Sequence, residues 1–164
     1  MMSSTHPRIS RAVFEQEAPT IVAALRLLRH AVERSELDRS LTELVKLHAS
    51  QLNGCAFCLQ YHLDEARRLG LAQAKIDLLA AWREADVFSD RERAALAWTE
   101  ALTLMFEGPI ADSQYADLRS EFSASEVVHL TSAVGEINAW NRIAGALKFS
   151  PSSSVGQPCD GGRS

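Results

Sequence analysis

Apolar residues recur every three or four positions along most of the chain, which is the spacing of a helix with one buried face. Between Pro19 and about Ser35, for example, Ile21, Leu25 and Leu28 fall on one such face. We find no useful length of the apolar–polar alternation that marks a half-buried strand. The pattern therefore predicts an all-α fold of about six or seven helices, over residues 19–35, 38–52, 55–70, 72–84, 89–107, 113–121 and 123–148.

Capping signals mark several of the expected helix boundaries. The stretches at residues 89–92 and 123–126 read Ser-Asp-Arg-Glu and Ser-Ala-Ser-Glu, and both are capping boxes that open a helix. Asn53 and Gly54 form a stop signal that ends one helix just before the next begins.

Two glycines, Gly135 and Gly145, fall inside the long last helix. Each costs about 1 kcal/mol relative to alanine in a helix interior. We therefore expect another helix to pack closely against them.

The 164 residues are enough for one domain with a sizeable core. We expect a flexible N-terminus at residues 1–14 and a helical domain over residues 15–150. Residues 151–164 are rich in Ser, Gly and Pro, so we expect them to form a disordered tail. Cys159 lies in that tail, where a mobile thiol is poorly placed for catalysis.

Composition and charge exclude several classes of partner. The formal net charge of −4 gives no electrostatic reason to bind nucleic acid or an anionic membrane. No apolar run approaches the roughly 20 residues that cross a bilayer. The first ten residues lack the apolar core of a secretory signal, so we expect a cytoplasmic protein whose cysteines are reduced at rest.

The candidate chemistry lies between residues 43 and 62. Cys55, Cys58 and His62 are spaced i, i+3, i+7, which places them on one face if a helix starts at Cys55. Seven residues span about 10 Å of helix rise, so His62 can serve Cys58 but hardly Cys55. Glu43 lies at a similar height to His62 across the helical hairpin that Asn53 and Gly54 form. The order of a proton relay would then be Glu43, His62, Cys58, Cys55.

This set of side chains suits redox chemistry at sulfur. A thiolate is the nucleophile, and both a helix N-terminus and an adjacent imidazole favour its formation. A second thiol one turn away can trap the oxidised sulfur as a disulfide. The helix dipole favours Cys55 as the activated thiol, whereas the histidine spacing favours Cys58. We assign the reactive role to Cys58, because a directed base also moves the proton during the reaction.

Other interpretations of the same residues stay open at this point. Cys55, Cys58 and His62 could be three zinc ligands, although a structural site needs a fourth, for which His48, Glu43 and Cys159 are the candidates. His48 lies on an apolar stripe and fits a satisfied core histidine. Glu43 and Lys46 could form an ordinary ion pair.

At these residues the sequence resembles the carboxymuconolactone decarboxylase superfamily, in its AhpD-like alkylhydroperoxidase branch. Lys46-Leu47 after Glu43, Asn53 shortly before the C-x-x-C, and His62 four residues beyond the second cysteine all match the family pattern. Residues 93–103 and 138–142 also look typical of the branch, so the resemblance covers about residues 15–148.

The resemblance implies an all-helical homo-oligomer, a trimer or hexamer, that reduces hydroperoxides without a cofactor or metal. It implies that Cys58 is the peroxidatic cysteine, Cys55 the resolving cysteine, and Glu43 and His62 the proton relay. An external dithiol, from a lipoyl or thioredoxin-like protein, would restore the pair. Some members have a histidine immediately before the second cysteine, where this chain has Phe57. That leaves the relay to Glu43, His62 and water.

Three hypotheses follow for the function. The first is a thiol-dependent alkyl hydroperoxidase with Cys55, Cys58, His62 and Glu43 as catalytic residues. The second is a thiol–disulfide oxidoreductase or redox sensor without a fast peroxide step. The third is a non-catalytic oligomeric scaffold.

Overall fold

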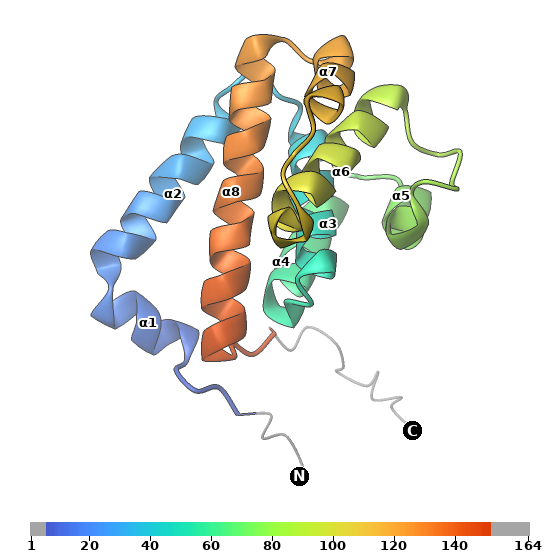
Figure 1. Ribbon diagram of the computed structural model, residues 1–164. Coiled ribbons are helices and arrows are strands. Elements are labelled where there is room, and N and C mark those ends of the chain that lie inside the picture. Colours follow the sequence, from blue (N-terminus) through green and yellow to red (C-terminus); the bar gives the residue numbers. More distant parts are fainter. Residues whose placement is uncertain (1–5, 152–164) are drawn as a thin grey trace, which may run out of the picture.

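The computed structural model describes residues 6–151, and this part of the chain is helical with no strand. Figure 1 shows the long helix α8 with α2 along one side and the group of α3, α4 and α6 along the other. None of the helices in the described range has the length and hydropathy needed to cross a membrane. The helices are α1 (Arg11–Glu17), α2 (Pro19–Glu33), α3 (Arg39–Leu52), α4 (Ala56–Arg68), α5 (Gln73–Leu78), α6 (Asp90–Thr103), α7 (Asp112–Glu121) and α8 (Ala124–Leu147), with short 3-10 helices at Leu79–Ala81 and Met105–Glu107.

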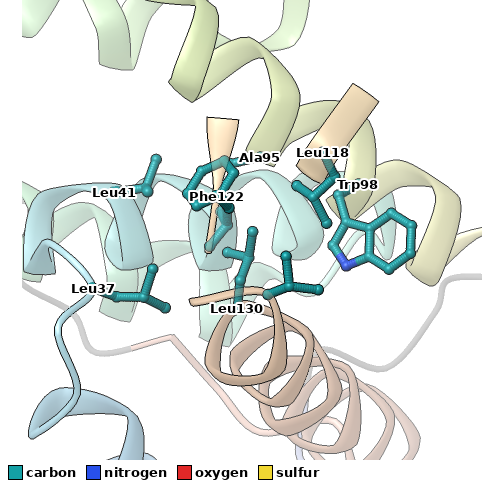
Figure 2. Close-up of a cluster of buried hydrophobic side chains, with 9 residues drawn as sticks. Leu37, Leu41, Ala95, Trp98, Leu118, Phe122 and Leu130 are labelled. Carbon is teal, nitrogen blue, oxygen red and sulfur yellow. The ribbon is translucent and has the colours of Figure 1, made fainter. Parts of the chain in front are cut away.

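Helix α3 is the centre of the fold, and its ten consecutive residues 41–50 are all buried. Leu41 and Val45 belong to one apolar cluster, shown in Figure 2, with side chains of α6, α7 and α8. Leu44 and Leu47 pack with α4, the segment after α4, and α6. Ala49 joins a third cluster, formed with α4 and α8. A helix that packs on every side has no solvent face, so its polar residues must find partners inside the protein.

The predicted fold class is confirmed, and the boundaries that rested on caps are close. Ser89 and Ser123 make both reciprocal hydrogen bonds of a capping box, at the starts of α6 and α8. Asp38 caps α3 through its side chain. Cys55 is the N-cap of α4, so the C-x-x-C stands at the start of a helix as expected.

Three boundaries differ from the sequence-based expectation. Residues 11–14, assigned to a flexible N-terminus, form the first turn of α1, because Ser10 caps a helix there. The helix expected over residues 72–84 ends at Leu78 and continues as a 3-10 turn. The helix expected to reach residue 107 ends at Thr103 and is likewise followed by a 3-10 turn. The expected tail at residues 151–164, with Cys159, lies outside the described residues apart from residue 151.

The expectation of close packing at the two glycines of α8 is wrong within the chain. A Cβ atom added at Gly135 or Gly145 would meet no atom within 4 Å, because both positions face outward. Their small size is therefore not required by the described fold.

We predict that Gly135→Ala stabilises the chain by up to about 1 kcal/mol, because alanine restricts the unfolded chain and favours the helix. Gly70→Ala is the matched control. It also meets no neighbouring atom, but φ is +76° there, so alanine should be destabilising. Urea denaturation of both variants measures the difference, and a loss of stability in Gly135→Ala would contradict the prediction.

Candidate active site

The thiol pair lies where α4 begins, buried against α3 and α8. The Sγ of Cys55 accepts a hydrogen bond from the backbone N–H of Cys58, at 3.3 Å, and so caps α4. Both thiols are free and both side chains are buried. The two cysteines of the sequence motif are thus direct neighbours, as their spacing predicted.

An amide cluster between α3 and α8 reaches the thiols. Asn53, at the end of α3, donates to the Oδ1 atoms of Asn138 and Asn141 at 3.0 and 2.9 Å. Asn141 in turn donates to Ser50 Oγ at 3.1 Å, and its side chain also hydrogen-bonds to Cys55. The sequence indicated Asn53 as a helix stop and as a family-pattern residue, and it indicated Asn141 only as part of the typical segment 138–142. Their hydrogen bonds give Asn141 a direct role in the environment of the sulfur atoms.

The two thiols titrate as a coupled pair, because each changes the pKa of the other. A hydrogen bond from the Cys58 thiol, together with the Cys58 backbone N–H and Asn141, lowers the pKa of Cys55 to about 7. The same bond raises the pKa of Cys58, because that thiol donates its proton to Cys55, and burial raises it further. When the pair loses its first proton, the negative charge therefore lies on Cys55, at the positive end of the helix dipole.

Access to the pair comes from a pocket of about 230 Å³ between α1, α2, α4 and α8. Of the two cysteines in the described range, Cys58 alone lines it, next to His62. The thiol with the lowered pKa is thus Cys55, whereas the cysteine that lines the pocket is Cys58. A molecule that enters the pocket therefore meets Cys58 first, with Cys55 outside the pocket wall.

The structure brings Glu43 and His62 together, as the height argument predicted. Nδ1 of His62 lies 2.6 Å from Oε2 of Glu43, with both side chains buried. Burial alone raises the pKa of the Glu43 carboxyl, but the hydrogen bond with His62 and the charge of Lys46 outweigh it, so the pKa lies below its usual value. A carboxylate that accepts from Nδ1–H leaves Nε2 as the nitrogen available for proton transfer.

No hydrogen bond joins His62 to either sulfur among the side chains described. His62 and Cys58 instead meet at the wall of the same pocket. A proton moving between them must pass through a molecule in that pocket, either water or the substrate.

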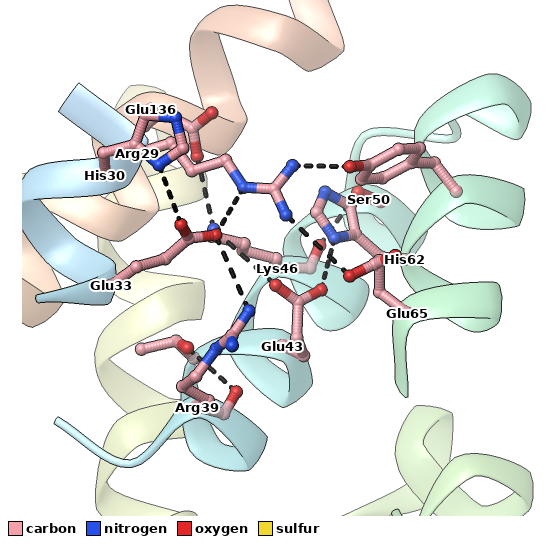
Figure 3. A network of polar contacts seen from close by, with 12 residues as sticks. Arg29, His30, Glu33, Arg39, Glu43, Lys46, Ser50, His62, Glu65 and Glu136 are labelled. Atoms are coloured by element: carbon pink, nitrogen blue, oxygen red, sulfur yellow. Dashed lines mark hydrogen bonds and ion pairs between the residues drawn. The ribbon is translucent and has the colours of Figure 1, made fainter. Parts of the chain in front are cut away.

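Lys46 extends this arrangement into the core, which the sequence did not predict beyond a simple pair with Glu43. Its ammonium group lies 3.7 Å from Glu43 Oε1 and 3.6 Å from Glu136 Oε2, and the side chain is 1% exposed. Figure 3 shows Lys46 between these two carboxylates, with His62 on the far side of Glu43. Glu136 also lines the pocket, so a chain of charged groups leads from His62 through the core and back to the pocket wall.

The other residues considered from the sequence fall elsewhere. Nε2 of His48 lies 2.9 Å from Glu100, which also accepts from the indole of Trp82, so His48 is a satisfied buried histidine. Residues 6–151 contain no group of three or more His, Cys, Asp or Glu side chains placed to hold a metal ion. The zinc ligand set with His48 or Glu43 as fourth member is therefore not assembled. Phe57, between the cysteines, forms part of the pocket wall.

We predict that Lys46→Met lowers the free energy of unfolding by about 3 kcal/mol, because it leaves two buried carboxylates without their shared cation. Lys75→Met is the matched control. Its partner Glu92 lies 2.6 Å away, but the Lys75 side chain is 27% exposed, so the loss should stay below about 1 kcal/mol. Urea denaturation measures both, and equal losses would refute the importance of the buried cation.

The asymmetry of the thiols gives a second prediction, best tested in a Cys159→Ser background so that only the pair titrates. Ultraviolet thiolate absorbance should show one thiolate per chain forming as the pH rises through about 7. Cys58→Ala should move this titration upward, toward that of an ordinary thiol, because the side chain that donates to Cys55 is gone. Cys55→Ser should abolish it. Retention of the titration in Cys55→Ser would place the charge on Cys58 instead.

Known proteins similar to this chain share both its sequence and its fold. The family model described as "Carboxymuconolactone decarboxylase family" matches residues 19–101. The uncharacterized protein YdfG of Bacillus subtilis is 34% identical over 137 residues, which cover 84% of this chain and 93% of that protein. These matches include the whole C-x-x-C region.

Two solved structures superpose well. A protein of unknown function from Agrobacterium tumefaciens, named for a suspected AhpD role in antioxidant defence, is 37% identical with a TM-score of 0.85, covering 91% of this chain and all of that one. An uncharacterized peroxidase-related protein of Ralstonia eutropha, described as an alkylhydroperoxidase AhpD core, shares the fold, with a TM-score of 0.75 at 18% identity over 86% of this chain and 75% of that one. The chain therefore belongs to the carboxymuconolactone decarboxylase family, in its AhpD-like branch.

Proposed function

We propose that the protein is a thiol-dependent alkyl hydroperoxidase, with Cys58 as the peroxidatic cysteine. One observation carries the proposal: Cys58 and His62 line the same pocket, while Cys55 lies hydrogen-bonded behind Cys58. A hydroperoxide in this pocket can touch the reactive sulfur and a proton-transfer group at the same time. The resolving thiol needs no large movement to follow.

In the first step the Cys58 sulfur attacks the terminal oxygen of the hydroperoxide. The S–O bond forms as the O–O bond breaks, and the Cys58 proton passes to the Cys55 thiolate. The departing alkoxide takes a proton from His62, whose orientation the Glu43 carboxylate maintains. The products are an alcohol and a sulfenic acid on Cys58.

In the second step the Cys55 sulfur attacks the sulfenic sulfur, the S–S bond forms as the S–O bond breaks, and the Cys55 thiol proton passes to the departing hydroxide, which leaves as water. The sum is one hydroperoxide and two thiols converted to one alcohol, one water and one disulfide. An external dithiol, such as a lipoyl or thioredoxin-like protein, then reduces the disulfide by exchange. We further propose that the protein works as a trimer or hexamer in the cytoplasm, where such dithiols are kept reduced.

A second function, thiol–disulfide exchange without a fast peroxide step, is favoured by the lowered pKa of Cys55. A thiol with a pKa near ambient pH is well suited to attack a disulfide. Against it, Cys55 is buried and is not part of the pocket wall. Stopped-flow rates with cumene hydroperoxide and with a small disulfide compare the two functions directly.

We predict that reduced Cys159→Ser protein loses two thiols per chain when mixed with one equivalent of cumene hydroperoxide. Adding Cys58→Ser should abolish the reaction. Adding Cys55→Ser should slow the reaction, because the thiolate that takes up the Cys58 proton is gone, and should stop it at a sulfenic acid, which dimedone traps. Thiol titration and intact mass measure all three proteins. Retention of both thiols in excess peroxide, or full reactivity of the Cys58→Ser variant, would refute the proposal.

A further inference from the structure

The pocket changes character from its floor to its mouth. At the floor, Cys58, His62 and Glu136 are buried. At the mouth, Arg11 of α1 and Arg26 of α2 line the same pocket with side chains that are 48% and 56% exposed. Two solvent-facing guanidinium groups therefore line the same pocket as the thiol of Cys58.

Between floor and mouth the walls are largely apolar and aromatic. Phe57, Tyr61, Ile137 and Trp140 line this region. The pocket volume of about 230 Å³ exceeds the ~150 Å³ of a cavity that binds benzene. The walls thus have room for the hydrocarbon body of an organic hydroperoxide.

The mouth carries more positive than negative charge. Glu15 accepts from Arg11 at 3.0 Å and from Arg26 at 3.3 Å, so one carboxylate serves two guanidinium groups. The chain as a whole has a net charge of −4, so this excess is a local feature. Arg29, deeper in the pocket, differs because Glu33 and Glu65 both lie beside it.

Phe57 helps to hold the charge at the mouth. The Arg11 guanidinium lies 5.6 Å from the centre of the Phe57 ring, within the range of a cation–π contact. Phe57 also packs edge-on against Phe149, at 5.4 Å between ring centres. The residue between the cysteines therefore links the pocket mouth to the thiol pair, in the position where some relatives carry a histidine.

We propose that the preferred substrate is an organic hydroperoxide that bears a carboxylate at the end remote from the peroxide, which rests on the peroxidase function proposed above. The carboxylate binds Arg11 and Arg26, the hydrocarbon body lies on the aromatic walls, and the hydroperoxide reaches Cys58. Arginine pairs well with carboxylate because its planar fork donates two parallel hydrogen bonds.

A matched pair of substrates tests this proposal: cumene hydroperoxide and its para-carboxylate derivative. We expect kcat/KM to be about three- to tenfold higher for the carboxylate, since each partly exposed ion pair contributes up to about 1 kcal/mol. The preference should shrink as the ionic strength rises from about 0.02 M to about 0.5 M, because salt screens exposed charges.

Three variants should change the carboxylate-to-neutral ratio of kcat/KM in different ways. Arg11→Gln with Arg26→Gln should reduce the carboxylate-to-neutral ratio toward one. Glu15→Gln should increase the ratio, because it frees both guanidinium groups. Arg67→Gln is the control, since Arg67 lies on α4 with an exposed side chain and pairs with Asp64 away from the pocket. Equal ratios in all four proteins, or a preference for the neutral peroxide, would overturn the proposal.

A binding measurement distinguishes a failure of the carboxylate site from a failure of the peroxidase function. Calorimetry with 4-isopropylbenzoate, which has no peroxide, should show binding that weakens at least threefold in the double arginine variant. If neither peroxide reacts but this binding persists, the peroxidase function fails and the carboxylate site stands. If cumene hydroperoxide reacts but the benzoate does not bind, the carboxylate site fails alone.

Discussion

The buried cation of Lys46 is the interaction on which the rest of the site depends. Helix α3 packs on every side, so Glu43 can reach His62 only from inside the core. An isolated carboxylate there would take up a proton and would no longer orient the His62 ring as a charged hydrogen-bond acceptor. The hydrogen bond with His62 and the charge of Lys46, 3.7 Å away, lower the pKa of Glu43 and keep it ionised, and Lys46 also forms an ion pair with Glu136 at the pocket wall. Helix α3 therefore supplies both the apolar residues of the core and the buried charges that set the ionisation of the site.

Much of the fold could be predicted because the caps are local. Three helix starts could be predicted because an N-cap side chain accepts from a backbone N–H only three residues later, as at Asp38, Ser89 and Ser123. Helix α1 was missed because it buries none of its residues, and so it leaves no apolar stripe in the sequence. Gly135 was misjudged for a related reason, since a glycine shows that space is available but not which neighbour uses it.

The candidate site was likewise predictable only where its residues lie close together in the sequence. Cys55, Cys58 and His62 lie on one helix, and Glu43 lies across a short turn, so helix geometry alone relates them. Asn141, Glu136 and the arginines of the pocket come from helices distant in sequence, and only the packing of α8, α1 and α2 brings them near. The helix dipole indicated Cys55 as the activated thiol and the histidine spacing indicated Cys58, and the sequence could not relate these two indications. Spacing could not show that the sulfur bearing the charge and the sulfur facing the pocket are different atoms.

The residue that caps the start of helix α4 is Cys55, a member of the thiol pair. The sulfur of Cys55 accepts the free backbone N–H of Cys58 in the first turn of the helix, and while it is a thiolate it also meets the positive end of the helix dipole. Sulfur in a disulfide is uncharged and a weak acceptor, so forming the bond removes that cap. If the pair cycles as proposed, every oxidation loosens the first turn of α4 and every reduction tightens it again. The folding free energy of one helix end is then part of the driving force that returns electrons to the pair.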